Sequence, residues 1–208
     1  MRKITASDNE STRKKNNVLF KKRQLQIVKK ATKLFMKKGY AQTSMREISK
    51  ATGIDISNLY YFIKSKDEIL FRVFEMIHQP EIELFEKLDI KSIDDPVKQL
   101  RTVIRILIDF GYNYREEILL LYRESKVLSK RLIKIILTRE SHFVSQIEEI
   151  LKNGLGKKVF HFEDASFTAN LIVYELSLYP LRNWNLKKYS KEELIYLIEM
   201  HVMKAVMI

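Results

Sequence analysis

The 208-residue sequence predicts an all-α protein built from two helical domains. Three observations predict this fold class. With only 5 Gly and 3 Pro, the composition is unlike that of a β-rich or low-complexity chain. Apolar residues recur at helical spacing through most of the chain, and no alternating run indicates a strand. Charge is also distributed unevenly, which indicates two parts with different partners.

Basic residues are concentrated in the first third of the chain. Residues 1–66 hold 17 of the 38 Lys and Arg residues but 4 of the 26 Asp and Glu residues, so the whole excess of +12 lies there. A basic segment joined to a nearly neutral one favours a polyanion bound by one end of the protein. A membrane surface would attract the same charge. An interfacial helix, however, needs a large exposed apolar face, and the apolar residues of 18–66 fit a small core.

Residues 1–16 are polar and lack helical periodicity, which predicts a mobile basic tail. The first long helix is expected over residues 17–38, where apolar positions follow helical spacing between many lysines. Gly39 should end this helix in the left-handed conformation.

The stretch 43–66 predicts a helix-turn-helix. Ser44 and Glu47 form a capping-box pattern, which starts a short helix. Gly53 stands where the turn needs a positive φ. A second helix is expected over 55–62, and in this motif the second helix enters the major groove. Three helices of an ordinary bundle would give a similar pattern, so the basic charge is what favours DNA binding.

The second helix of this motif has one clear inward position, Leu59. Asp55, at its start, is expected to cap the helix, because an anion is disfavoured beside phosphate. The remaining side chains point outward and are candidates for reading DNA bases. These candidates are Ile56, Ser57, Asn58 and Tyr60.

The runs ATKLFMKKGYAQTSMREISKATGI and LYYFIKSKDEIL resemble the DNA-binding domain of the TetR (tetracycline repressor-like) family. The resemblance implies a three-helix DNA-binding domain over 17–66 and a helical ligand-binding and dimerisation domain over 67–208. It also implies DNA contacts from Thr43, Tyr61 and Lys66, with Ser44 beside them. Departures from the family pattern at residues 55–57 leave the operator sequence open.

Helical spacing continues through the second part of the chain. Helices are expected over 96–114, 116–127, 129–153, 164–183 and 191–207. Gly154 and Gly156 are expected to cap the third of these, because a glycine after a helix is usually a cap.

Charged residues interrupt the apolar stripes of the second part. Arg139 and Glu140 fall within the stripe of the long helix, and Arg123 lies four residues after Leu119. A charge there is costly unless it is paired, so the pattern indicates either a buried Arg–Glu pair or a cavity holding an anionic ligand group. Aromatic residues could line that cavity or belong to the core. They are Phe110, Tyr114, Tyr122, Phe143 and Tyr174.

A weaker resemblance concerns the possible ligand. The runs ILLLYRESKVLSK and YELSLYPLRNWNLKKYSKEELI are similar to a TetR subgroup linked to fatty-acid and acyl-CoA breakdown. This similarity implies an acyl-CoA or fatty-acid-like inducer.

Several classes of function are disfavoured. The chain has no Cys, its 4 His are scattered, and it lacks known metalloprotease and nucleotide-binding motifs, so we expect no catalytic residue, metal or cofactor. No apolar run approaches the roughly 18 residues of a membrane span. The N-terminus lacks the apolar stretch of a signal peptide, so a cytoplasmic location without a membrane partner is expected.

Together these features predict a homodimeric repressor that binds a palindromic DNA operator and is released by a small amphipathic ligand. One alternative is a ligand-independent architectural DNA-binding protein, which weak sequence preference would indicate. Another is an enzyme on an all-helical bundle, which turnover of a substrate would indicate.

Overall fold

The computed structural model describes residues 6–208, without the side chains of 6–15, 80–82 and 84–86. Within this part the chain forms ten α-helices and two short 3-10 helices, and its only β pairing is an isolated bridge between Phe160 and Met207. This confirms the all-α fold class. The chain divides into two compact units, Met1–Met76 and Ile77–Ile208. This division lies beyond the boundary expected at residue 66.

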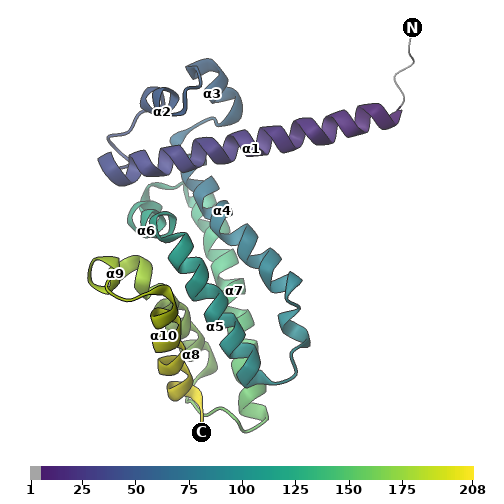
Figure 1. The fold of residues 1–208 in the computed structure, drawn as a ribbon, viewed down its shortest axis with the longest axis vertical. Coiled ribbons are helices and arrows are strands. Elements are labelled where there is room, and N and C mark those ends of the chain that lie inside the picture. Colours follow the sequence, from purple (N-terminus) through teal and green to yellow (C-terminus); the bar gives the residue numbers. More distant parts are fainter. Residues whose placement is uncertain (1–5) are drawn as a thin grey trace. The chain divides into compact units, whose positions relative to one another are not determined.

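The first unit contains α1 (Ala6–Lys38), α2 (Met45–Thr52), α3 (Ile56–Phe62) and the start of α4 (Lys66–Lys87) (Figure 1). Helix α1 begins at Ala6, within the segment expected as a mobile tail, and residues 1–5 lie outside the described part. Once the apolar stripe of α1 has formed a helix, each further residue adds a backbone hydrogen bond, so polar residues can extend it.

The core of the first unit comes from one stripe of α1 and the inward positions of the helices after it. Its fully buried members are Ile27, Ala31, Phe35, Ile48, Leu59, Ile63, Ile69, Leu70 and Val73. Gln24 of α1 donates a hydrogen bond of 2.8 Å to the carbonyl oxygen of Phe62, at the end of α3. Nearby, the rings of Phe20 and Phe62 lie 5.1 Å apart. These contacts fix α3 against α1.

The second unit holds the remaining helices. They are η1 (Ile90–Ser92), α5 (Pro96–Asn113), α6 (Arg115–Glu124), η2 (Ser125–Val127), α7 (Lys130–Gly156), α8 (Ala165–Leu176), α9 (Leu178–Leu186) and α10 (Lys191–Val206). Helix α5 packs against both α7 and α10, and α7 packs against α8 (Figure 1). One apolar core runs between these four helices, with Leu100, Ile104, Ile147 and Ile198 among its members.

The single helix expected over 164–183 is two helices, α8 and α9, which separate at Ser177. Pro180 explains the break, because proline has no N–H to donate to the carbonyl of Leu176. Gly154 and Gly156 were expected to follow α7 but lie inside it. A Cβ at Gly154 would lie 1.9 Å from a ring carbon of Phe160, so this glycine makes room for the aromatic ring.

Candidate nucleic-acid interface

The turn between α2 and α3 has the geometry predicted from the sequence. The Ser44 hydroxyl accepts a hydrogen bond from the Glu47 N–H, and the Glu47 carboxylate accepts one of 2.8 Å from the Ser44 N–H. This is a complete capping box. Gly53 has φ +70°, and a Cβ there would meet no atom within 4 Å. Backbone conformation rather than space therefore requires glycine at this turn.

Helix α3 is capped by Asp55, as predicted. Its carboxylate accepts hydrogen bonds from the backbone N–H groups of Ser57, at 2.9 Å, and Asn58, at 3.0 Å. The bond from the Asn58 N–H is the main reason that the pKa of Asp55 lies below its ordinary value. The Asn58 side-chain amide also donates to Asp55, which orients that amide at the first turn of the helix.

The outer side of α3 is open to solvent. Leu59 is fully buried, whereas Tyr60 is 47% exposed and Tyr61 is 72% exposed. Ile56, Ser57 and Asn58 are exposed as well. The side chains predicted to face DNA therefore share the surface of a helix that is anchored from behind by Leu59.

Thr43 is placed differently from the expectation. Its side chain is only 1% exposed, and its hydroxyl donates a hydrogen bond of 2.8 Å to the carbonyl oxygen of Gly39. This bond stabilises the turn between α1 and α2 and leaves the hydroxyl buried. Ser44, its neighbour, is exposed but holds the capping box.

Lys66 stands at the first residue of α4 and is held within the fold. Its ammonium group donates a hydrogen bond of 2.9 Å to the carbonyl oxygen of Tyr40 and lies 4.5 Å from the centre of the Tyr40 ring. The lysine thus joins α4 to the end of α1. Its charge stays at the surface, because the side chain is only half-buried.

The surface of α1 and α2 is strongly basic. Exposed cations follow both helices: Lys21, Lys22, Arg23, Lys29, Lys30, Lys33, Lys37, Lys38, Arg46 and Lys50. The only carboxylates in residues 16–66 are Glu47, which pairs with Lys38, and Asp55, which caps α3. This surface is suited to phosphate groups, which supply most of the affinity in protein–DNA contacts.

The residues predicted to hold a ligand lie in the second unit at several separate places. Phe110 stacks on Tyr114 with ring centres 4.4 Å apart. Tyr122 is 52% exposed, and its hydroxyl donates to Ser177 at 3.3 Å. Phe143 packs against the core, while Tyr174 is 61% exposed on α8. Exposure makes Tyr122 and Tyr174 unsuited to a closed cavity.

The charged residues predicted to form a buried pair or to line a cavity have different surroundings. Arg123 lies 4.0 Å from its neighbour Glu124, and about half of its side chain (49%) is exposed. The Oε1 atom of Glu140 lies 2.8 Å from the Nε2 atom of His78, and the His78 side chain is buried. Sequence reasoning gave His78 no role, since it sits far from Glu140 in the chain. Arg139, beside Glu140 on α7, is only partly exposed.

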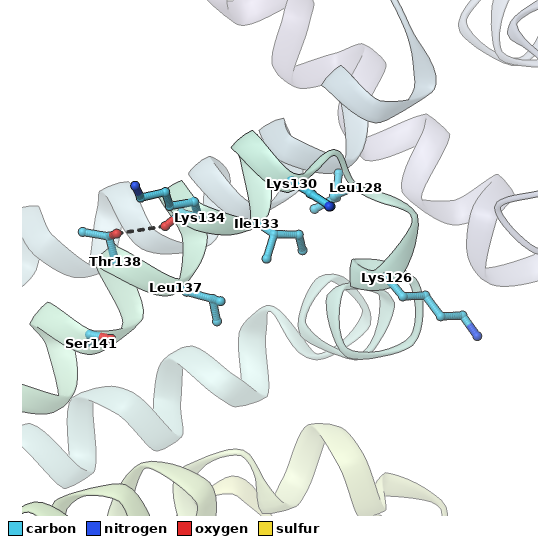
Figure 2. Close-up of a pocket in the computed structure, with 8 residues that line it drawn as sticks. All are labelled: Lys126, Leu128, Lys130, Ile133, Lys134, Leu137, Thr138 and Ser141. Carbon is cyan, nitrogen blue, oxygen red and sulfur yellow. Dashed lines mark hydrogen bonds between the residues drawn. The ribbon is translucent and has the colours of Figure 1, made fainter.

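A hollow of about 510 Å³ lies beside the first half of α7 (Figure 2). None of the seven predicted ligand residues lines it. Its lining comes from η2, the turn after it and one face of α7: Lys126, Leu128, Lys130, Ile133, Lys134, Leu137, Thr138 and Ser141. Their helical spacing is visible in the sequence, but the hollow depends on packing that periodicity does not predict.

Two family models match the chain. The model described as "Bacterial regulatory proteins, tetR family" matches residues 27–73, which include the helix-turn-helix. The model described as "Tetracyclin repressor-like, C-terminal domain" matches residues 94–177. The chain belongs to the TetR family. It is accordingly a DNA-binding transcriptional regulator and not an enzyme.

Similar proteins agree with this assignment. HbdR of Aromatoleum sp. (strain CIB), an HTH-type transcriptional regulator, is 24% identical over 190 residues, covering 87% of this chain and 81% of HbdR. YttP of Bacillus subtilis (strain 168), a probable HTH-type regulator, is 23% identical over 127 residues. That match covers 59% of this chain and 61% of YttP, less than two thirds of its length.

A solved structure shares the fold. AibR, crystallised with isovaleryl coenzyme A and operator DNA, superposes with a TM-score of 0.71 at 22% identity, covering 86% of this chain and 97% of that one.

Two kinds of feature are absent from the described residues of this TetR-family chain. No three His, Asp or Glu side chains among them are grouped closely enough to hold a metal ion. None of the helices in the described part combines the length and the apolar content that a bilayer crossing requires.

Glu47 should make the stability of the protein depend on pH. Its hydrogen bond with Lys38, followed by those from Ser44, lowers its pKa from 4.5 to about 2. A lowered carboxyl pKa stabilises the fold above the ordinary pKa, and this contribution is lost as the pH falls from about 4.5 to about 2. Glu47→Gln should therefore lower the melting temperature at pH 6 but have little effect near pH 2.

Thermal melts across this pH range test the prediction, with the exposed Glu163→Gln as the matched control. A Glu47→Gln effect that stays the same size at every pH would show that the charge of Glu47 contributes nothing.

Proposed function

We propose that this TetR-family regulator is a cytoplasmic, homodimeric repressor that binds a palindromic operator through α3. A small amphipathic ligand, an acyl-CoA or a fatty acid, releases it from DNA. The proposal rests on the outer side of α3. The side chains there are exposed, Asp55 caps the helix that carries them, and the surrounding unit is strongly basic.

Different residues have different roles in the proposed complex. Lys and Arg of α1 and α2, together with Tyr61 and Lys66, contact phosphates and set the register without reading sequence. Ile56, Ser57, Asn58 and Tyr60 of α3 face the bases. Ile56 suits a thymine methyl group, and the carbonyl oxygen of the Asn58 amide can accept a hydrogen bond from adenine.

An exposed apolar surface on α8 and α10 supports the dimer. We call it the α8–α10 surface and define it by Phe167, Leu171, Tyr174, Tyr196 and Leu197, each at least 46% exposed. The Nδ1 atom of His201 on α10 lies 2.9 Å from the Oε2 atom of Glu175 on α8, so the two helices are in contact there. Exposed apolar side chains gathered on two neighbouring helices favour an interaction site, and two copies of one such surface can form a two-fold interface.

Not all apolar residues of α8 and α10 lie on this surface. Ile172, Leu176, Leu194, Ile198, Val202 and Val206 are buried within the core of the unit itself. Leu171 and Leu197 are exposed, as an interface requires. Tyr174, which sequence analysis had assigned to the ligand, stands one turn after Leu171 on the same outer face of α8.

Release by a ligand is supported by likeness to AibR, whose structure contains both isovaleryl coenzyme A and operator DNA. In the proposed mechanism, ligand binding in the second unit changes the spacing of the two recognition helices through α4. Both helices must meet half-sites about one helical turn or a multiple of it apart, so a small change of spacing lowers operator affinity.

Asn58→Ala tests base reading by α3. The variant should lose roughly 1–3 kcal/mol of binding free energy at particular base pairs of the operator and little at the others. Fluorescence anisotropy with a set of single-base operator variants measures the loss at each position. Lys29→Ala, which removes an exposed α1 cation, is the matched control and should weaken binding to every sequence about equally.

An equal loss at all positions for Asn58→Ala would contradict base reading by this residue. If the wild-type protein also showed no preference among DNA sequences, the architectural alternative would replace the repressor.

A further inference from the structure

The hollow beside α7 has a marked excess of positive charge. Its eight lining residues include Lys126, Lys130 and Lys134 and no carboxylate (Figure 2). Within the described part of the chain, these three lysines form no ion pair with any carboxylate. Residues 67–208 are nearly neutral overall, so the cluster is a local feature and not a consequence of general basicity.

The floor of the hollow is apolar. Ile133 and Leu137 project from the same side of α7, and Lys126 extends from the neighbouring turn (Figure 2). Leu128, in the turn before α7, is buried, whereas Leu137 is 58% exposed. The exposed Leu137 side chain would be removed from water if an alkyl chain lay against it, and removing apolar surface from water is favourable.

We propose that this hollow binds an amphipathic anion, namely a single alkyl chain that ends in a carboxylate or phosphate. The chain lies against Leu128, Ile133 and Leu137, and the three lysines around the hollow supply the positive charge that attracts the head group. The volume of about 510 Å³ falls in the range of about 300–1,000 Å³ that is usual for small-molecule sites. Lysine side chains suit this role, because their flexible stems can bring a point charge to a head group of either kind.

This site differs from the one that the sequence indicated. Arg123 was a candidate for the head group, but its guanidinium lies 4.0 Å from the Glu124 carboxylate and its side chain does not line the hollow. The inference rests on the proposed function, since it locates the effector of that regulator. Ligand binding can nevertheless be measured without DNA, so the two can fail separately.

Calorimetric titration of the full-length protein with dodecanoate, dodecyl phosphate and uncharged dodecanol tests the site. Both anions should bind the wild type, and dodecanol should bind more weakly. The triple variant Lys126→Gln/Lys130→Gln/Lys134→Gln should weaken anion binding by on the order of 10- to 100-fold, because each exposed lysine contributes a modest charge interaction. Leu137→Ser should weaken it roughly fivefold through lost apolar contact.

Two matched controls separate the site from general effects of charge and surface. Lys98→Gln/Lys187→Gln/Lys204→Gln removes the same charge from exposed lysines of the same unit, and Leu155→Ser removes a 43% exposed leucine from the other end of α7. Neither variant should change anion binding. Circular dichroism melts confirm that each variant is folded before titration.

Three results would overturn the inference: no binding of either anion to the wild type, equal binding of dodecanol, or an equal loss in the two triple variants. Co-sedimentation with phosphatidylglycerol vesicles tests whether the hollow binds a membrane surface instead of a free anion. Vesicle binding that needs Lys126, Lys130 and Lys134, with no uptake of the free anions, would assign the hollow to a membrane surface instead. Wild-type binding to operator DNA, measured in parallel, shows whether the proposed regulator survives any of these failures.

Discussion

Leu171→Glu/Tyr174→Glu should convert the protein to monomers and weaken operator binding by at least about 100-fold. Both residues lie on the outer face of α8, where Leu171 is 47% exposed and Tyr174 is 61% exposed in the single chain. Such exposure lets the monomer fold with glutamate at both positions. In a two-fold interface the same carboxylates would be buried without partners, which costs several kcal/mol.

The loss of DNA affinity follows from the loss of the second recognition helix. Two linked binding units gain about 10²–10⁴ in affinity over one unit, because the second contact becomes intramolecular. Analytical ultracentrifugation and operator titration measure the two effects on the same samples.

Leu88→Glu/Leu155→Glu places the same two charges on exposed leucines outside the α8–α10 surface and serves as the control. It should remain dimeric and bind the operator normally. A Leu171→Glu/Tyr174→Glu variant that stays dimeric would remove the α8–α10 surface from the assembly.

Phe160→Ala should lower the free energy of unfolding by about 3–5 kcal/mol, the usual cost of deleting a large aromatic side chain from a core. Phe160 is 1% exposed and packs against the backbone of α7 at Gly154, where a Cβ would lie 1.9 Å from its ring. Its N–H donates to the carbonyl oxygen of Gly154, at 3.2 Å, so ring and backbone are fixed together.

Urea unfolding at one fixed protein concentration measures this change, since the stability of a dimer depends on concentration. The control is Leu155→Ala, next to Gly154 on α7 but 43% exposed, which should stay within about 0.5 kcal/mol of the wild type. Equal losses in the two variants would mean that Phe160 is not an anchor of the core.

Local rules predicted the DNA-binding unit well, because its signals involve residues close together in sequence. The Ser44–Glu47 capping box, the positive φ of Gly53 and the Asp55 cap each concern at most four neighbouring residues. Thr43, which the family resemblance assigned to DNA, is buried, because a turn folds its hydroxyl back onto the carbonyl oxygen of Gly39.

The second unit was predicted less well, because its details depend on contacts between distant segments. The break between α8 and α9 follows from Pro180, a local signal that the apolar periodicity around it concealed. The burial of His78 against Glu140 and the packing of Phe160 on Gly154 arise only when segments pack together. For the same reason, the sequence did not predict the lysine-lined hollow beside α7, whose lining contains none of the aromatic and arginine candidates.

Selection of DNA from a random-sequence library by the full-length protein tests whether the dimer reads a specific operator. A dimeric regulator reading bases through α3 should enrich an inverted repeat with half-sites about one helical turn or a multiple of it apart. Sedimentation should then find two protomers on each enriched site, and Asn58→Ala should alter the enriched bases within both half-sites. A library that shows no enriched sequence, together with salt-sensitive binding to all DNA, would contradict the account.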